Sequence, residues 1–116
     1  MTKRIKSGKG WHLVRGEGFV LLARRWPARF DVCAMTILPP MRLVPLVHMV
    51  RQDIWRALRR LRGFSPVVEA RVTDLGVSVT AGGQVSGPLP AKALVERLRA
   101  VLDHAPNRER WHRCAR

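Results

Sequence analysis

The side chains best suited to chemistry are the indole and guanidinium groups between residues 45 and 62. Trp55 stands one helical turn after Arg51 and one turn before Arg59. An indole between guanidiniums provides a stacking surface for a base beside forks that bind phosphate, a combination suited to single-stranded nucleic acid. In a duplex, the same arginines could contact phosphates or guanine edges. We predict a nucleic-acid contact through one helical face, made by Arg51, Trp55, Arg56, Arg59 and Arg62.

Other interpretations of this face stay open. Trp55 and Met49 could be covered by the C-terminal helix or by a second protomer, which would leave the arginines as a solvated face. An acidic protein partner could bind the same side chains, because Arg and Trp are enriched at interface hot spots. A component of a phage-like nucleoprotein particle, or a homodimer joined through the apolar part of this helix, also fits the pattern.

Basic residues gather at both ends of the chain as well. Residues 1–9 have no apolar periodicity, so we expect a flexible basic arm there. Near the other end, the spacing of Trp111, Cys114 and Ala115 predicts that Trp111 docks on the core. Both ends add candidate phosphate-binding residues, which are Lys3, Arg4, Lys6, Lys9, Arg108, Arg110 and Arg113. A third cluster comprises Arg24, Arg25, Trp26 and Arg29, where Trp26 could stack on a base or cap the sheet edge.

The overall charge supports a polyanionic partner. Lys and Arg number 22 against 8 Asp and Glu, for a formal net charge of +14. That exceeds the roughly 2 to 8 charges that suffice to keep a small domain in solution. A GC-rich genome explains the preference for Arg over Lys, but it does not by itself explain the scarcity of acids. Because like charges repel in a compact state, the simplest partner is a phosphate-rich one, DNA or RNA.

The sequence contains no recognisable catalytic, metal or cofactor motif. The eight acids are scattered singly, whereas metal-dependent nucleases need converging carboxylates. Asp31 and Glu69 could meet on neighbouring strands, but we expect each to pair with an arginine. Gly82-Gly83 and Gly87 form no phosphate-binding loop and are predicted to be turn glycines. Signatures of RNA-binding domains and zinc fingers are absent. We therefore expect a non-enzymatic accessory or regulatory protein with no cofactor and no metal.

The two cysteines and the apolar runs bear on location. Cys33 and Cys114 are far apart and belong to no C-x-x-C pair, so neither a disulfide framework nor a zinc ribbon is indicated. Cys33 is expected in a core strand. The apolar run 19–23 is too short for a signal peptide, and no run reaches the roughly 18 residues that span a bilayer. We expect a cytoplasmic protein without a membrane segment.

The elements that must position these residues form a single α+β domain over residues 10–116. Period-two runs bounded by Gly and Pro predict antiparallel meanders with strands at 11–15, 19–25, 30–38, 66–73, 77–81 and 84–86. Helical periodicity predicts two main helices, 45–62 and 91–103, and Pro106 begins a short C-terminal helix. The predicted order is βββαβββα plus that last helix. Because the aliphatic residues of the first helix share one sector, its arginines point away from the sheet.

Overall fold

The structure is a computed structural model that describes residues 3–7 and 10–116, with only the main chain described over 3–7. Its strands are β1 (Lys3–Ser7), β2 (Trp11–Gly16), β3 (Phe19–Ala23), β4 (Val32–Leu38), β5 (Phe64–Thr73) and β6 (Gly76–Val85). Its helices are α1 (Leu43–Leu58), α2 (Ala91–Asp103) and α3 (Ala105–Ala115). The chain is therefore an α+β protein, as its periodicities predict.

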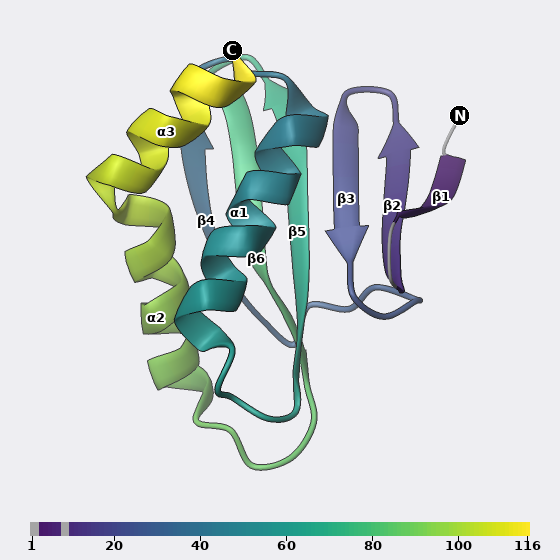
Figure 1. The fold of residues 1–116 in the computed structure, drawn as a ribbon, viewed down its shortest axis with the longest axis vertical. Helices are drawn as coiled ribbons and strands as arrows, with labels where there is room; N and C mark the ends of the chain where they lie inside the picture. The colour runs from purple at the N-terminus through teal and green to yellow at the C-terminus, as the bar shows by residue number, and fades with distance from the viewer. Residues whose placement is uncertain (1–2, 8–9) are drawn as a thin grey trace.

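The strands form one antiparallel sheet in the order β1-β2-β3-β5-β6-β4. All three helices lie on the same face of this sheet, with α1 over β5 and β3 and α2 over β4 (Figure 1). In the described part of the chain, no helix covers β1 or β2 (Figure 1). The exposed flank of α1 and the uncovered strands beside it therefore form an open shoulder of the molecule.

The core lies between the sheet and the helices. Alternate residues of the neighbouring strands β5 and β6, such as Val68 and Val79, point toward the helices and are fully buried. On α1 the predicted aliphatic face is confirmed over its inner part, where Leu46, Val50 and Ile54 are fully buried. This packing determines which way α1 is rotated, and so which of its side chains remain at the surface.

The helices follow the sequence pattern closely. α2 has the predicted bounds, and α3 begins one residue before the predicted start at Pro106. α1 ends at Leu58, four residues before the predicted end, where Leu61 N–H donates to Leu58 O in a tighter turn. Gly63 follows with φ of 81°, and a Cβ there would lie 2.1 Å from Ser86 O. Glycine is thus required for the chain to pass this point.

The position of β4 differs from the expected meander. β3 is flanked by β2 and β5, so the third predicted strand cannot pair with it. β4 instead pairs with β6 at the far edge of the sheet, from Val32↔Gly83 to Leu38↔Val77. Consecutive strands need not be neighbours, and local patterns carry no information on which edge a strand joins.

The N-terminal segment also differs from its expectation. Residues 3–7, predicted to belong to a flexible arm, form β1, which pairs with β2 from Lys3↔Arg15 to Ser7↔Trp11. An edge strand is held by main-chain hydrogen bonds, which need no apolar periodicity. Residues 1, 2, 8 and 9 of the predicted arm lie outside the described residues.

Gly82 and Gly83 are not turn residues. They lie inside β6, which runs without interruption through the two short strands predicted at 77–81 and 84–86. A Cβ on Gly82 would lie 2.0 Å from Val32 O, and one on Gly83 would lie 2.1 Å from Ser65 O. The glycines therefore allow β4 and β5 to approach β6 closely on its two sides.

Cys33 is not a core residue either. Its neighbours Val32 and Ala34 occupy the face of β4 that meets the helices, so Cys33 points to the opposite face and is exposed, as are Met35 and Ile37. Cys33 and Cys114 are both free thiols. Within the described residues, no helix is both long enough and apolar enough to cross a membrane.

Candidate functional site

A cleft of about 560 Å³ lies on the open shoulder, between the C-terminal half of α1 and the nearby strands. The first residue of β2, the residue after β3 and the start of β5 supply part of its wall, and α1 and the turn that follows it supply the rest. The residues lining it are Trp11, Arg24, Arg51, Gln52, Ile54, Trp55, Leu58, Arg59, Leu61, Phe64 and Pro66. Its volume falls within the range of pockets that hold a small ligand or a single nucleotide.

The cleft combines two indoles with three guanidiniums. The Arg51 guanidinium carbon lies 4.9 Å from the centre of the Trp11 ring, and that of Arg24 lies 5.7 Å from the same ring. Arg59 stands 5.6 Å from the centre of the Trp55 ring. Trp55 remains 48% exposed. These are cation–π distances, so each indole holds a cation beside a ring face that can stack on a planar group.

Arg51 is the most constrained cation of the cleft. Its Nε atom is buried and has no hydrogen-bond partner among the described residues. Burial lowers the pKa of this guanidinium, which nevertheless stays charged because arginine titrates far above neutral pH. Burial, and to a smaller extent the charge of Arg51, lowers the pKa of His48 one turn earlier. Positive charge is thus held here against desolvation without a neutralising carboxylate.

No Asp or Glu is among the residues that line the cleft. Three acids of the described chain pair with arginines elsewhere: Asp31 with Arg29 at 2.7 Å, Glu69 with Arg71 at 3.6 Å, and Asp53 with Arg110. The preference of Asp31 and Glu69 for arginine partners is therefore confirmed. Asp31 also accepts a hydrogen bond from Val85 N–H, and its contacts with Arg29 and Val85 lower the pKa of its carboxyl group.

The predicted helical face divides into two sides. Arg51, Trp55 and Arg59 line the cleft. Arg56 instead lines a separate hollow between α1 and the last two helices, beside Arg97. Arg62 lies in the turn before Gly63, beyond the end of α1. The difference arises because residues 55 and 56 are about 100° apart around a helix, and α1 ends before Arg62.

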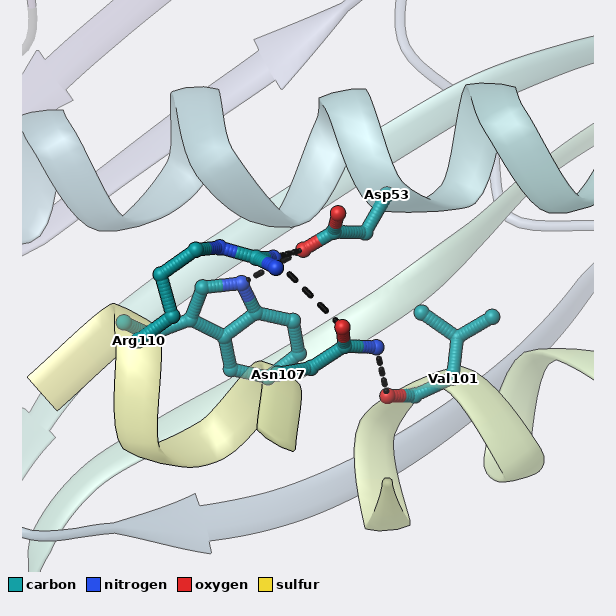
Figure 2. Close-up of polar contacts among 5 residues, drawn as sticks. Asp53, Val101, Asn107 and Arg110 are labelled. Atoms are coloured by element: carbon teal, nitrogen blue, oxygen red, sulfur yellow. Dashed lines mark hydrogen bonds and ion pairs between the residues drawn. The ribbon is translucent and has the colours of Figure 1, made fainter. Parts of the chain in front are cut away.

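The C-terminal helix does not cover Trp55. It docks on Asp53 instead, where Trp111 Nε1 donates to Asp53 Oδ2 at 2.7 Å and Arg110 Nη2 donates to the same oxygen. Figure 2 shows Arg110 of α3 turned toward Asp53 of α1, while Asn107 lies between Arg110, whose Nη2 donates to Asn107 Oδ1, and Val101 near the end of α2, to whose O atom Asn107 Nδ2 donates. Trp111 is fully buried, which confirms that it anchors this helix.

The remaining predicted contacts are distributed between fold and surface. Arg108 donates to Thr36 Oγ1 at 2.8 Å, to Ile37 O at 3.0 Å and to Leu102 O at 3.1 Å, so its guanidinium ties α3 to β4. Arg113 is exposed on α3. Three basic residues of the predicted arm, Lys3, Arg4 and Lys6, belong to β1, and Lys9 lies outside the described residues.

Sequence reasoning missed two members of the cleft. Trp11 was assigned only to the start of a strand, and Arg24 to a separate cluster in the following turn. Trp26 of that cluster is 44% exposed, its ring centre lies 6.1 Å from that of His12, and it is not among the residues that line the cleft. Trp11 could have been suspected from the alternation of β2, because Trp11 shares a strand face with the core residue Leu13.

Among the residues that the structure describes, no three His, Cys, Asp or Glu side chains gather where they could hold a metal ion. In comparisons with protein-family models, curated proteins and solved structures, the chain matches none.

Proposed function

We propose that the protein is a non-enzymatic nucleic-acid-binding protein that uses the cleft beside α1. The observation that carries the proposal is the composition of its lining: two indoles and three guanidiniums, with no carboxylate among them. Planar bases stack on indoles, and arginine forks match phosphate oxygens. Nucleic acid is the abundant ligand class that offers both groups side by side.

The state of Arg51 supports an anionic ligand. A buried donor without a partner costs about 1 to 3 kcal/mol. The wall that holds Arg51 supplies no acceptor to Nε, and its two neighbouring cations along the cleft raise the local positive potential further. A phosphate entering the cleft would relieve that repulsion, and with a formal charge of +14 the whole chain would attract it from a distance.

A protein that binds nucleic acid without catalysing a reaction would act as an accessory or regulatory factor, and we propose such a role. We also propose that the protein is cytoplasmic. The two free thiols suit a reducing compartment. An acidic protein remains the alternative partner, because the same indoles and guanidiniums are typical of interface hot spots. The experiment below distinguishes the two partners.

The test compares charge reversals at two arginines that are three residues apart and line different hollows. Arg59→Glu changes the cleft, whereas Arg56→Glu changes the same helix on the side of the other hollow. Fluorescence anisotropy with a labelled oligonucleotide should show about tenfold weaker binding, about 1.4 kcal/mol, for Arg59→Glu and a smaller loss for Arg56→Glu. Binding by the unmodified protein should weaken steeply with salt. The logarithm of the binding constant should fall with the logarithm of the salt concentration, with a slope of about −0.7 to −0.9 for each neutralised phosphate.

Equal losses in both variants would show that only net charge matters and would remove the cleft from the proposal. If the folded protein bound no DNA or RNA at low salt, nucleic-acid binding itself would be rejected. The acidic protein partner would then become the leading explanation for the Arg and Trp side chains.

A further inference from the structure

A further hollow, which we call the second hollow, lies on the same flank of α1 as the cleft. It lies at the N-terminal end of the helix, whereas the cleft lies at the C-terminal end. The volume of the second hollow is about 610 Å³, and it is formed where the β2–β3 turn meets the start of α1. The residues lining it are Arg15, Gly16, Gly18, Phe19, Val20, Arg42, Leu43, Val44 and Pro45. Like the cleft, it contains guanidiniums and no carboxylate among its lining residues.

No residue lines both hollows, but β2 and α1 each contribute residues to both of them. Trp11, Leu13 and Arg15 alternate along β2 and therefore lie on one face of the strand, with Trp11 in the cleft and Arg15 in the second hollow. Residues 44, 48, 51 and 55 of α1, and residue 59 directly after it, follow one another at three and four residue spacing, so they form one ridge. This ridge joins Val44 of the second hollow to Trp55 and Arg59 of the cleft.

The length of this flank matches a short stretch of nucleic acid. From Val44 to Trp55 the helix rises about 16 Å, at 1.5 Å per residue. At about 3.4 Å per stacked nucleotide, that distance corresponds to roughly five nucleotides. Between the two ends lie His48, half-buried on the ridge, and Leu13, buried on the strand.

We infer that the flank of α1 binds a single strand of nucleic acid about five nucleotides long, with bases stacked at the Trp11–Trp55 end and a phosphate held by Arg15 at the other. This inference rests on the proposed function and narrows its ligand to unpaired strands. Arg15 is exposed and aligned with the hollow, whereas Arg42 beside it already donates to Cys114 O at 3.3 Å. Arg15 is therefore the better phosphate ligand of the pair.

An unpaired strand fits this flank better than a duplex does. The indoles lie inside a cleft between a helix and a strand, where only a base turned out of a stack can reach a ring face. A duplex presents base edges in its grooves and keeps the faces of its bases stacked on each other. The 48% exposed ring of Trp55, flanked by Arg59, supplies the stacking surface and the cation together.

The experiment measures affinity against oligonucleotide length for single-stranded DNA and RNA and for a blunt duplex. Single strands should bind progressively more tightly from two to about six nucleotides and then level off, and the duplex should bind at least about tenfold more weakly than the six-nucleotide strand. Arg15→Glu should weaken the six-nucleotide strand about tenfold, lower its salt slope by about 0.7, and leave the dinucleotide within about twofold. Trp55→Ala should weaken both lengths.

Lys92→Glu on α2 is the matched control, because it removes the same charge from an exposed position outside both hollows. It should leave the difference in affinity between the dinucleotide and the six-nucleotide strand unchanged.

Equal effects of Arg15→Glu on the dinucleotide and the longer strand would overturn the two-ended site. Duplex binding as tight as single-strand binding would overturn the single-strand preference while leaving nucleic-acid binding in place, and a folded protein with no affinity for any of these ligands would instead reject the proposed function. A difference between the DNA and RNA arms would show which sugar the flank prefers.

Discussion

The two flanks of α1 differ in whether a carboxylate lies beside their arginines. On one flank Asp53 is buried and receives hydrogen bonds from Arg110 and Trp111, so that α3 is fastened to the helix. On the other flank, two residues further along the chain, Trp55 lies in a cleft that has no Asp or Glu among its described lining residues. Asp53 thus supplies the negative charge at the junction between α1 and α3, whereas in the cleft a ligand could supply it.

In a protein this rich in arginine, the contacts of each guanidinium distinguish two kinds of arginine. An arginine that completes a hydrogen-bond network, such as Arg108, belongs to the fold, however basic its surroundings are. An arginine that rests on an indole without an acid, such as Arg51 or Arg59, keeps its phosphate-binding capacity. Three measurements test this division between the flank that fastens α3 and the flank proposed to bind nucleic acid.

The largest effect is expected for Trp111→Ala. Trp111 is fully buried against the core and donates to Asp53, so its removal should lower the free energy of unfolding by about 3 to 5 kcal/mol. Trp55→Ala is the control of equal size on the binding flank, and it should cost much less because Trp55 is half-exposed. Urea unfolding followed by circular dichroism measures both. Similar losses for the two variants would mean that the flanks do not differ in this way.

A smaller effect is expected for Asp53→Ala. The substitution leaves Trp111 Nε1 and the Arg110 guanidinium without their shared acceptor, which should cost about 1 to 3 kcal/mol of stability. Gln52→Ala, one residue earlier and exposed, should stay within about 0.5 kcal/mol. Oligonucleotide affinity of the folded Asp53→Ala protein should be unchanged. A loss of affinity without a loss of stability would place Asp53 on the binding side instead.

The smallest effect concerns pH and His48. Because burial and Arg51 lower the pKa of His48 below 6.5 in the folded protein, the unfolded chain takes up the proton first as the pH falls. The free energy of unfolding should therefore decrease as the pH drops below 6.5, until the folded-state pKa is reached. Unfolding titrations at pH 7.5 and 5.5 should show a smaller difference for His48→Gln than for the unmodified protein. An unchanged difference would indicate that His48 is not desolvated on this flank.

Local patterns predicted much of this protein because they report local constraints. The apolar spacing over 91–103 is a helical one, and α2 has those bounds. Proline at the start of α3 and glycine after α1 marked the ends of helices through backbone geometry alone. The sector of aliphatic residues in α1 indicated that Arg51, Trp55 and Arg59 lie off the core face. This prediction requires only the helical periodicity and not the identity of the elements that pack on α1.

The class of fold, the approximate positions of the helices and the cationic side of α1 were thus predictable from the order of the residues. The pairing of β4 at the far edge, the docking of α3 on Asp53 rather than on Trp55, and the place of Trp11 and Arg24 in the cleft depend on the three-dimensional packing. These outcomes depend on contacts between residues distant in the chain, such as Trp11 with Arg51. Periodicity describes which face of an element is apolar, but the choice of neighbour depends on how all the elements pack at once.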